Sequence, residues 1–167
     1  PALPLTGFVV SGLLGKRLGK SFVSAVGVGS AALAPLAAYS RLLPFFSGRH
    51  SPVTETLAAW IAAGDFAVDL TLRLDPLSGL MVSFVTFVGF LIHLYSVGYM
   101  KRGETDAGYA RYFAYLNLFL FAMLLLVLAD NFLLMFVGWE GVGLCSYLLV
   151  GYHYDRKYAA DAGKKAF

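Results

Sequence analysis

Charged residues and cysteine are both scarce in this chain, and each shortage narrows the class of protein. Charged side chains make up 14% of the 167 residues, whereas an ordinary soluble domain carries about 25%. Hydrophobic residues reach 59%, and the mean hydropathy is +0.71. Because the apolar residues gather in long runs, the sequence predicts an integral membrane protein rather than a soluble domain.

Several kinds of chemistry are excluded by what is missing. The one cysteine, Cys145, lies inside an apolar run, so neither a disulfide framework nor a cysteine metal cluster is available. No phosphate-binding loop, dinucleotide motif or Ser-His-Asp pattern is present. The net charge of +3 comes from basic residues in short segments between apolar runs, which indicates membrane topology rather than nucleic-acid binding.

Five apolar runs predict an all-α polytopic bundle of transmembrane helices. The helices are expected at about residues 1–14, 22–43, 77–97, 112–128 and 132–152. The first is shorter than the ~20 residues a crossing helix needs, which suggests missing N-terminal residues. Pro35 predicts a kink in the second, and Ala159–Phe167 predicts the start of a further element that is cut short.

Lysine and arginine predict the orientation of these helices. Arg41, Arg49 and Arg73 fall on one side, and the other ten fall on the opposite side: Lys16, Arg17, Lys20, Lys101, Arg102, Arg111, Arg156, Lys157, Lys164 and Lys165. The positive-inside rule assigns the side with ten basic residues to the cytoplasm.

The segment between the second and third helices predicts a short extracytoplasmic β-hairpin or strand at about residues 57–75. Apolar and other residues alternate from Phe66 to Asp75, which is the period of a half-buried strand. Gly64-Asp65 predicts a turn before it. Pro76 suits the first turn of the third helix, and either Asp130 or Asn131 is expected to cap the fifth.

Glu140 is the main candidate for chemistry, because it is the one charged residue in Phe132–Tyr152. A carboxyl group at mid-membrane costs roughly 3 kcal/mol, so its default interpretation is a proton or ion relay. The alternative is a protonated glutamic acid that hydrogen-bonds a neighbouring helix. Gly138, Gly141 and Gly143 around it allow either close helix packing or a water chain. No basic residue lies deep in any predicted helix, so a cationic partner would have to come from sequence outside this chain.

The third helix carries a second candidate, His93. Small and polar residues recur on one face of this helix, at Gly79, Ser83, Thr86, Gly89, His93 and Ser96. Such a stripe is either a helix–helix seam, which we favour, or the wall of a hydrated path. His93 qualifies as a secondary proton relay because imidazole exchanges protons near neutral pH. Asn117 in the fourth helix is expected to form an interhelical hydrogen bond.

These residues resemble a known family. Leu128-Ala-Asp-Asn131 followed by Gly138-Trp-Glu-Gly-Val-Gly-Leu-Cys-Ser-Tyr-Leu-Leu149 is similar to the chain L subunits of proton-pumping NADH–quinone oxidoreductase, respiratory complex I. Supporting matches are Leu74-Asp-Pro-Leu-Ser78, Phe90-Leu-Ile-His-Leu-Tyr-Ser96 and Tyr112-Phe-Ala-Tyr-Leu-Asn-Leu118. Related cation/proton antiporter subunits share the acidic residue, but the Gly-Val-Gly after it favours the complex I member.

The resemblance implies a role for each candidate. Glu140 would be the proton-transfer group of a first half-channel and His93 a secondary one, with a lysine beyond Phe167 as the partner of Glu140. The chain would be part of a translocase that oxidises NADH and reduces quinone, with no redox chemistry of its own. It would bind no cofactor or metal itself, while the complex as a whole holds FMN, iron–sulfur clusters and quinone.

The resemblance also implies the setting of the chain. Its partners would be other membrane subunits, especially neighbouring antiporter-like ones, with lipid and protons, in the inner (plasma) membrane of a bacterium. Residues 1–111 would form an N-terminal membrane region and residues 112–167 the start of the first antiporter-like bundle. Two alternatives stay open: a subunit of a multisubunit cation/proton antiporter without redox coupling, and a purely structural membrane subunit.

Overall fold

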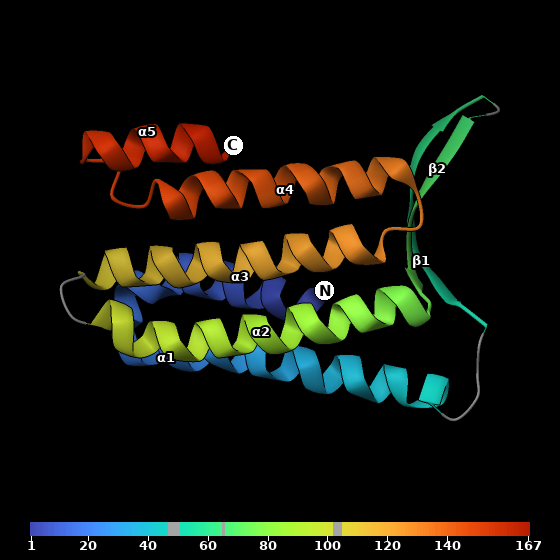
Figure 1. The fold of residues 1–167 in the computed structure, drawn as a ribbon, viewed down its shortest axis with the longest axis horizontal. Coiled ribbons are helices and arrows are strands. Elements are labelled where there is room, and N and C mark those ends of the chain that lie inside the picture. Colours follow the sequence, from blue (N-terminus) through green and yellow to red (C-terminus); the bar gives the residue numbers. More distant parts are fainter. Residues whose placement is uncertain (47–50, 65, 102–104) are drawn as a thin grey trace.

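The computed structural model describes residues 1–46, 51–64, 66–101 and 105–167. These form, in chain order, the elements α1 Ala2–Phe46, β1 Val53–Ala63, β2 Phe66–Leu74, α2 Pro76–Lys101, α3 Asp106–Leu128, α4 Phe132–Val150 and α5 Lys157–Ala166 (Figure 1). Within the described ranges, α1 to α4 are long and apolar enough to cross a membrane. The all-α membrane fold with a short β-hairpin is therefore confirmed.

The first two predicted helices are joined within α1 by a turn at one residue. Only Gly19 leaves the helical conformation, with φ 78° and ψ 176°, a left-handed value that favours glycine. In one straight helix, residues 7 and 30 would lie about 35 Å apart, yet Gly7 packs against the side chain of Ser30. The chain thus reverses at Gly19, which lies between the two predicted helices, and helical conformation extends up to this residue from both sides. Pro35 lies within the second half without ending it.

Helix α3 is the centre of the bundle and packs against α1, α2 and α4. Its buried residues Tyr109 and Phe113 form a core cluster with Val23, Met100 and Tyr152 from neighbouring elements. Asn117, fully buried, accepts a hydrogen bond of 2.7 Å from the Ser30 hydroxyl of α1. The predicted interhelical hydrogen bond of Asn117 is confirmed.

The polar stripe of α2 forms a packed helix–helix seam, as favoured from the sequence. Thr86, His93 and Ser96 are buried in it. The hydroxyls of Thr86 and Ser96 each donate to a carbonyl of their own helix, at 2.7 Å, and Ser96 also lies 3.2 Å from the Tyr112 hydroxyl of α3. At Gly89, an added Cβ would lie 2.9 Å from the Leu120 side chain, so glycine permits the close approach of α2 to α3.

The two strands form an antiparallel hairpin at one end of the bundle (Figure 1). Strand β1 begins at Val53, four residues before the expected start, and pairs with Leu74 at the base of the hairpin. Val68, Leu70, Leu72 and Leu74 are half-buried along one face of β2, as the alternation predicts. Gly64 at the turn has a φ of 61°, while Asp65 lies outside the described residues.

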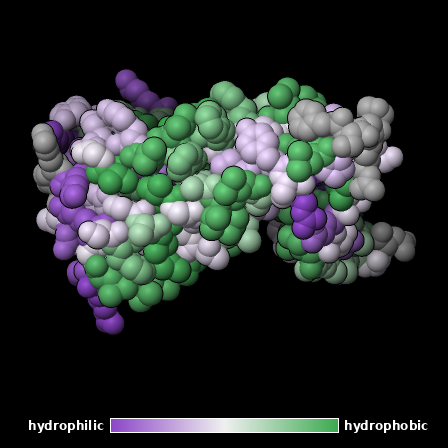
Figure 2. Space-filling model, turned by 90° about the horizontal axis from the view of Figure 1, so that it is seen from below, coloured by the Kyte–Doolittle hydropathy of each residue, from purple (hydrophilic) through white to green (hydrophobic). Residues whose placement is uncertain are grey.

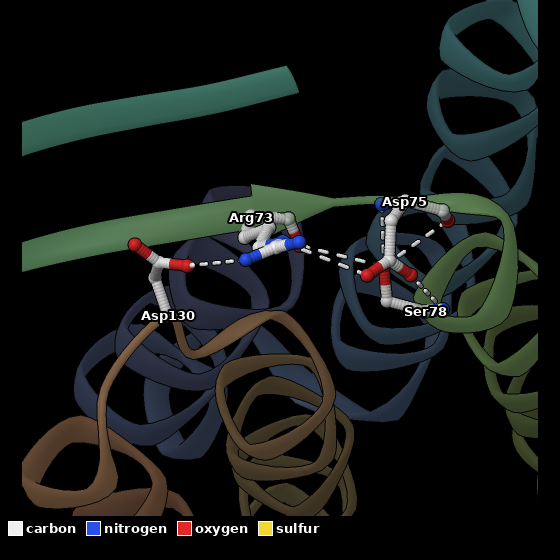
Figure 3. Close-up of polar contacts among 4 residues, drawn as sticks. All are labelled: Arg73, Asp75, Ser78 and Asp130. Carbon is white, nitrogen blue, oxygen red and sulfur yellow. Dashed lines mark hydrogen bonds and ion pairs between the residues drawn. The ribbon is translucent and has the colours of Figure 1, made fainter. Parts of the chain in front are cut away.

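Strand β2 is tied to the α3–α4 turn and to the start of α2. Arg73 of β2 lies between two carboxylates, 3.6 Å from Asp75 and 3.6 Å from Asp130 (Figure 3). The backbone N–H of Asp130 donates to the Thr71 carbonyl at 3.1 Å, and the Asn131 side chain donates to the Asp69 carbonyl at 2.9 Å. The hairpin therefore contacts the N-terminal ends of α2 and α4.

Both helix starts at this end are capped by side chains. Asn131, not Asp130, caps α4, because its side-chain oxygen accepts from the Leu134 N–H. Asp75 and Ser78 form a reciprocal capping box before α2, with both hydrogen bonds at 2.8 Å (Figure 3). The hydrogen bond from the Ser78 backbone N–H lowers the pKa of Asp75 below its usual value of 3.8, with further help from the Ser78 hydroxyl and Arg73.

Basic residues gather at the end of the bundle opposite the hairpin. The Lys20 ammonium donates to the Lys101 carbonyl at 3.3 Å, so the α1 turn and the end of α2 meet there. Hydrophobic residues dominate the middle of the molecule and hydrophilic ones lie toward its ends (Figure 2). Lys164 and Lys165 were predicted at this end with the other basic residues. They belong instead to α5, which runs back beside α4 (Figure 1). Arg49 and Arg102 lie outside the described residues, and the cytoplasmic assignment stays a prediction.

Candidate functional site

Helix α4, which carries Glu140, packs on α3 through one face. Its buried residues Leu134, Gly138 and Cys145 lie toward α3. A Cβ added at Gly138 would lie 2.6 Å from the backbone nitrogen of Leu126, and one at Gly141 would lie 3.0 Å from Ala122. These two glycines therefore serve close helix approach, which decides between the two uses that the sequence left open for them.

Glu140 lies on the opposite, exposed face of α4. Glu140 lies two residues after Gly138, which corresponds to a rotation of about 200° around the helix axis. The Glu140 side chain therefore points away from α3. Phe136 and Trp139 near it are 57% and 65% exposed. Within the described part of the chain, no hydrogen bond or ion pair reaches the Glu140 carboxyl group. Any partner of this group must therefore approach from outside the bundle of α1 to α4.

Helix α5 covers the part of this exposed face nearest the basic end. Gly163 of α5 approaches the Gly151 backbone so closely that a Cβ on Gly163 would lie 3.0 Å from the Gly151 Cα. The Phe167 ring meets the Tyr147 ring edge-on, with centroids 6.5 Å apart, and lies 3.8 Å from the Cβ position of Gly143. Gly143 is one helical turn from Glu140, so α5 ends beside the candidate site.

The sequence predicted only the start of a further element at residues 159–167 and gave it no role, because an isolated ten-residue segment carries only a weak signal. The spacing of its small residues could have predicted that α5 packs on another helix. Ala159 and Gly163 lie four residues apart, a pattern that lets two helices approach closely. Both are buried against α4, whereas Lys164 is exposed and lies 3.6 Å from Asp161.

His93, the second candidate, lies in the seam of α2 with α3 and is 1% exposed. Its Nδ1 lies 2.7 Å from the Gly89 carbonyl, and its ring lies 6.3 Å from that of Phe113. His93 therefore belongs to the α1–α2–α3 bundle, while Glu140 faces away from that bundle. The two predicted site residues are not brought together.

The arrangement can hold one ionisable acid at mid-membrane and leave it open to a further protein segment. An exposed carboxyl group on a 19-residue apolar helix is costly in lipid and gains from a cation, water or a proton. Together with the four apolar helices of the described ranges, the fold defines the class: a polytopic helical membrane protein.

Solved structures with this fold support the class. The membrane-bound sulfane sulfur reductase, an archaeal respiratory membrane complex, matches with a TM-score of 0.81 at 22% identity, over 99% of this chain and 32% of that chain. The Mrp complex from Dietzia sp. DQ12-45-1b matches with a TM-score of 0.68 at 31% identity, over 89% of this chain and 15% of that chain.

Sequence comparison gives the family. Residues 60–113 match the model of the NADH-ubiquinone oxidoreductase (complex I) chain 5 N-terminus, and residues 129–167 match that of the NADH:quinone oxidoreductase/Mrp antiporter transmembrane region. The chain is 48% identical to NADH-quinone oxidoreductase subunit L of Escherichia coli (strain K12) and 46% identical to that of Mycobacterium tuberculosis (strain H37Rv), covering 99% of this chain in each case. It belongs to this subunit L family and spans 26% of the length of these two relatives.

Proposed function

We propose that this chain is part of a proton-translocating membrane subunit of NADH–quinone oxidoreductase and that Glu140 is a proton-transfer group in one of its half-channels. The observation that carries the proposal is the exposed carboxyl group on an otherwise uncharged apolar helix. The match of residues 129–167 to the antiporter transmembrane model supports it, since that region contains Glu140.

In this proposal the outward face of α4 is completed by further helices of the same subunit. A lysine on one of them would attract the Glu140 carboxylate, and charge movement along the membrane arm would change that attraction. Because an opposite charge favours the ionised form of each partner, such a change shifts the proton affinity of both groups. His93 is proposed as a secondary proton-transfer group, and residue 111 as the boundary between the N-terminal region and the antiporter-like bundle.

The proposal extends to partners and location. The chain would lie in the bacterial inner membrane against other membrane subunits of the complex. FMN, iron–sulfur clusters and quinone would be held elsewhere in that complex. This chain would contribute a proton path and no redox chemistry.

Glu140→Gln in the assembled complex tests the role of Glu140. Glutamine keeps the size of the side chain and can form hydrogen bonds, but it cannot take up or release a proton. We therefore expect the complex to assemble on native gels and its proton-pumping rate to fall at least tenfold. Glu55→Gln on the exposed strand β1 is the matched control and should pump normally. Pumping of Glu140→Gln at the wild-type rate would refute the relay role.

A cation/proton antiporter subunit without redox coupling is the second candidate. The 31% identity to the Mrp complex chain favours it, as does the family model shared by both kinds of protein. Oxidation of NADH by the purified native complex would decide for the first candidate, and its absence together with sodium–proton exchange would decide for the second. For a purely structural subunit, Glu140→Gln would leave transport unchanged.

A further inference from the structure

One side of α2 is left uncovered by the described parts of the chain. Its exposed residues up to Tyr95 are all large and hydrophobic, and we call them the outward face of α2: Leu77, Leu80, Met81, Phe84, Phe87, Leu91, Ile92, Leu94 and Tyr95. Leu77, Leu80 and Phe84 are between 63% and 73% exposed. No lysine, arginine, aspartate or glutamate occurs in α2 before Lys101. This face therefore requires apolar surroundings.

The sizes of these residues distinguish between lipid chains and another helix as those surroundings. Helix–helix contacts in membranes are enriched in glycine, alanine, serine and threonine, because small residues let backbones approach closely. The packed side of α2 follows this rule, with Gly79 against α1 and Gly89 and Ser96 against α3. The outward face contains none of these four residue types, and the exposed Gly98 lies beyond it. Its composition therefore favours lipid.

The length of the outward face matches the hydrocarbon layer of a bilayer. Leu77 and Tyr95 lie about 27 Å apart along the helix, at about 1.5 Å per residue, and the hydrocarbon layer is about 30 Å thick. Asp75 precedes this stretch and Lys101 follows it. The Tyr95 and Tyr99 rings stack near the Lys101 end, with centroids 5.8 Å apart. Tyrosine is enriched where membrane meets water, so this pair fits the headgroup level.

A groove of about 190 Å³ lies between α2 and α3 at the middle of this face. Its lining is apolar except for one histidine and includes Phe84, Val88, Ile92, His93, Leu120 and Met123. Phe84 and Ile92 are 63% and 47% exposed, so the groove opens toward the outward face. The His93 nitrogens offer it no polar contact, because Nδ1 lies 2.7 Å from the Gly89 carbonyl and Nε2 is buried. A hydrocarbon chain needs no hydrogen bond and suits such a lining.

We propose that the outward face of α2 contacts bilayer phospholipid and that one acyl chain lies in the groove between α2 and α3. Tyr95, Tyr99 and Lys101 then lie at the level of the headgroups, and the acyl chain covers His93 from the lipid side. The exposed face of α4 differs, because Glu140 requires a cation, water or a proton rather than lipid. The inference uses only the composition and packing of α2 and α3, so it does not rest on the proposed function.

Photocrosslinking in intact cells tests what surrounds α2 in the assembled complex. p-Benzoylphenylalanine has nearly the shape of phenylalanine, and on irradiation it bonds to a neighbouring C–H group. We expect Phe84→p-benzoylphenylalanine and Phe87→p-benzoylphenylalanine to add the mass of a phospholipid to the subunit, with no crosslink to a polypeptide. A crosslink to another subunit, or to another part of the same subunit, would overturn the proposal.

Phe136→p-benzoylphenylalanine is the matched control, because Phe136 is 57% exposed on α4 near Glu140. Under the proposed function further helices cover this position, and we expect a crosslink to protein there. A lipid adduct at Phe136 would contradict those helices and leave the inference about α2 standing. A reaction at Phe136 with no lipid adduct at Phe84 or Phe87 would overturn the inference about α2 alone.

A density map of the complete complex in lipid nanodiscs tests the acyl chain. At a resolution that shows other lipid chains, we expect elongated density along the groove, in contact with Val88 and Leu120. Val88→Phe places a larger side chain in the groove and should remove this density. Leu80→Phe on the outward face, away from the groove lining, should keep it. A groove that is empty, or filled by a protein side chain, would overturn the proposal.

Discussion

Glu140 shows at the scale of one residue how chemistry and packing separate within a single helix. The side of α4 that packs on α3 is built from Leu134, Gly138 and Cys145, while the acid lies on the other side. An ionisable group in the packed seam would lose its solvation without gaining a partner. On the outward side it stays available to a cation or water from further helices.

Asp75 is the residue whose ionisation most clearly supports local structure. Its pKa is lowered by hydrogen bonds from Ser78 and by Arg73, so the ionised form is favoured in the folded state. The stabilisation is therefore complete above the unfolded value of 3.8 and is lost as pH falls through the lower folded pKa.

Asp75→Asn isolates this charge, because asparagine caps a helix as well as aspartate does. We expect the variant to be less stable than wild type by about 0.3–1 kcal/mol at neutral pH, since it lacks the favourable charge at the α2 N-terminus. The difference should shrink to zero as pH falls from 3.8 through the folded pKa. Unfolding midpoints of the two proteins across this pH range measure it.

Asp75→Ala provides the contrast, because alanine removes the cap itself. It should cost about 1 kcal/mol at low pH, where the charge is lost, and more at neutral pH, where the variant lacks the charge as well as the cap. A constant gap between wild type and Asp75→Asn at all pH values would contradict the assigned role of the charge.

At the scale of elements, glycine decides how closely helices approach and where they turn. Gly138 lets the backbone of α4 lie against that of α3 at Leu126. Gly19 lets α1 reverse within a single residue. At Gly98 and Gly29, by contrast, an added Cβ would meet nothing within 4 Å.

Gly138→Ala is expected to destabilise the subunit by about 1–3 kcal/mol, because the methyl group would clash with backbone that no rotamer change can move. Gly98→Ala, in the exposed part of α2, is the matched control. It should be neutral or more stable by about 0.5–1 kcal/mol, since alanine favours helix over glycine. Thermal unfolding of the two variants compares them, and equal effects would contradict the packing role of Gly138.

At the scale of the whole molecule, the two ends of the bundle differ in structure and in charge. The hairpin lies at one end, and the α1 turn, with Lys16, Arg17 and Lys20, lies at the other (Figure 1). The positive-inside rule predicts that the second end is cytoplasmic.

Single-cysteine labelling in intact cells tests this orientation. With Cys145 and other cysteines of the subunit replaced, Ala62→Cys in the exposed strand β1 should react with a membrane-impermeant maleimide added outside. Arg17→Cys should react only after the membrane is permeabilised. The reverse pattern would show that the topology is inverted.

Much of the architecture was predictable because it depends on local patterns. Apolar run length predicts the membrane helices, and the alternation over Phe66–Leu74 predicts strand β2. Caps follow from short-range side-chain chemistry. The α1 turn falls between the two predicted helices, but the sequence did not single out Gly19, because one left-handed glycine among helix formers gives almost no sequence signal. Residues 159–167 were predicted only as the start of a further element, because the partner helix α4 determines the position of α5.

The sequence by itself determined that this chain is a membrane protein with one acid at mid-membrane, since both follow from where charge occurs along the chain. Only the tertiary structure decided which face of α4 holds Glu140 and that His93 lies in a separate packed seam. These depend on how helices contact each other, because residues distant in the chain meet only when their small and large side chains fit together.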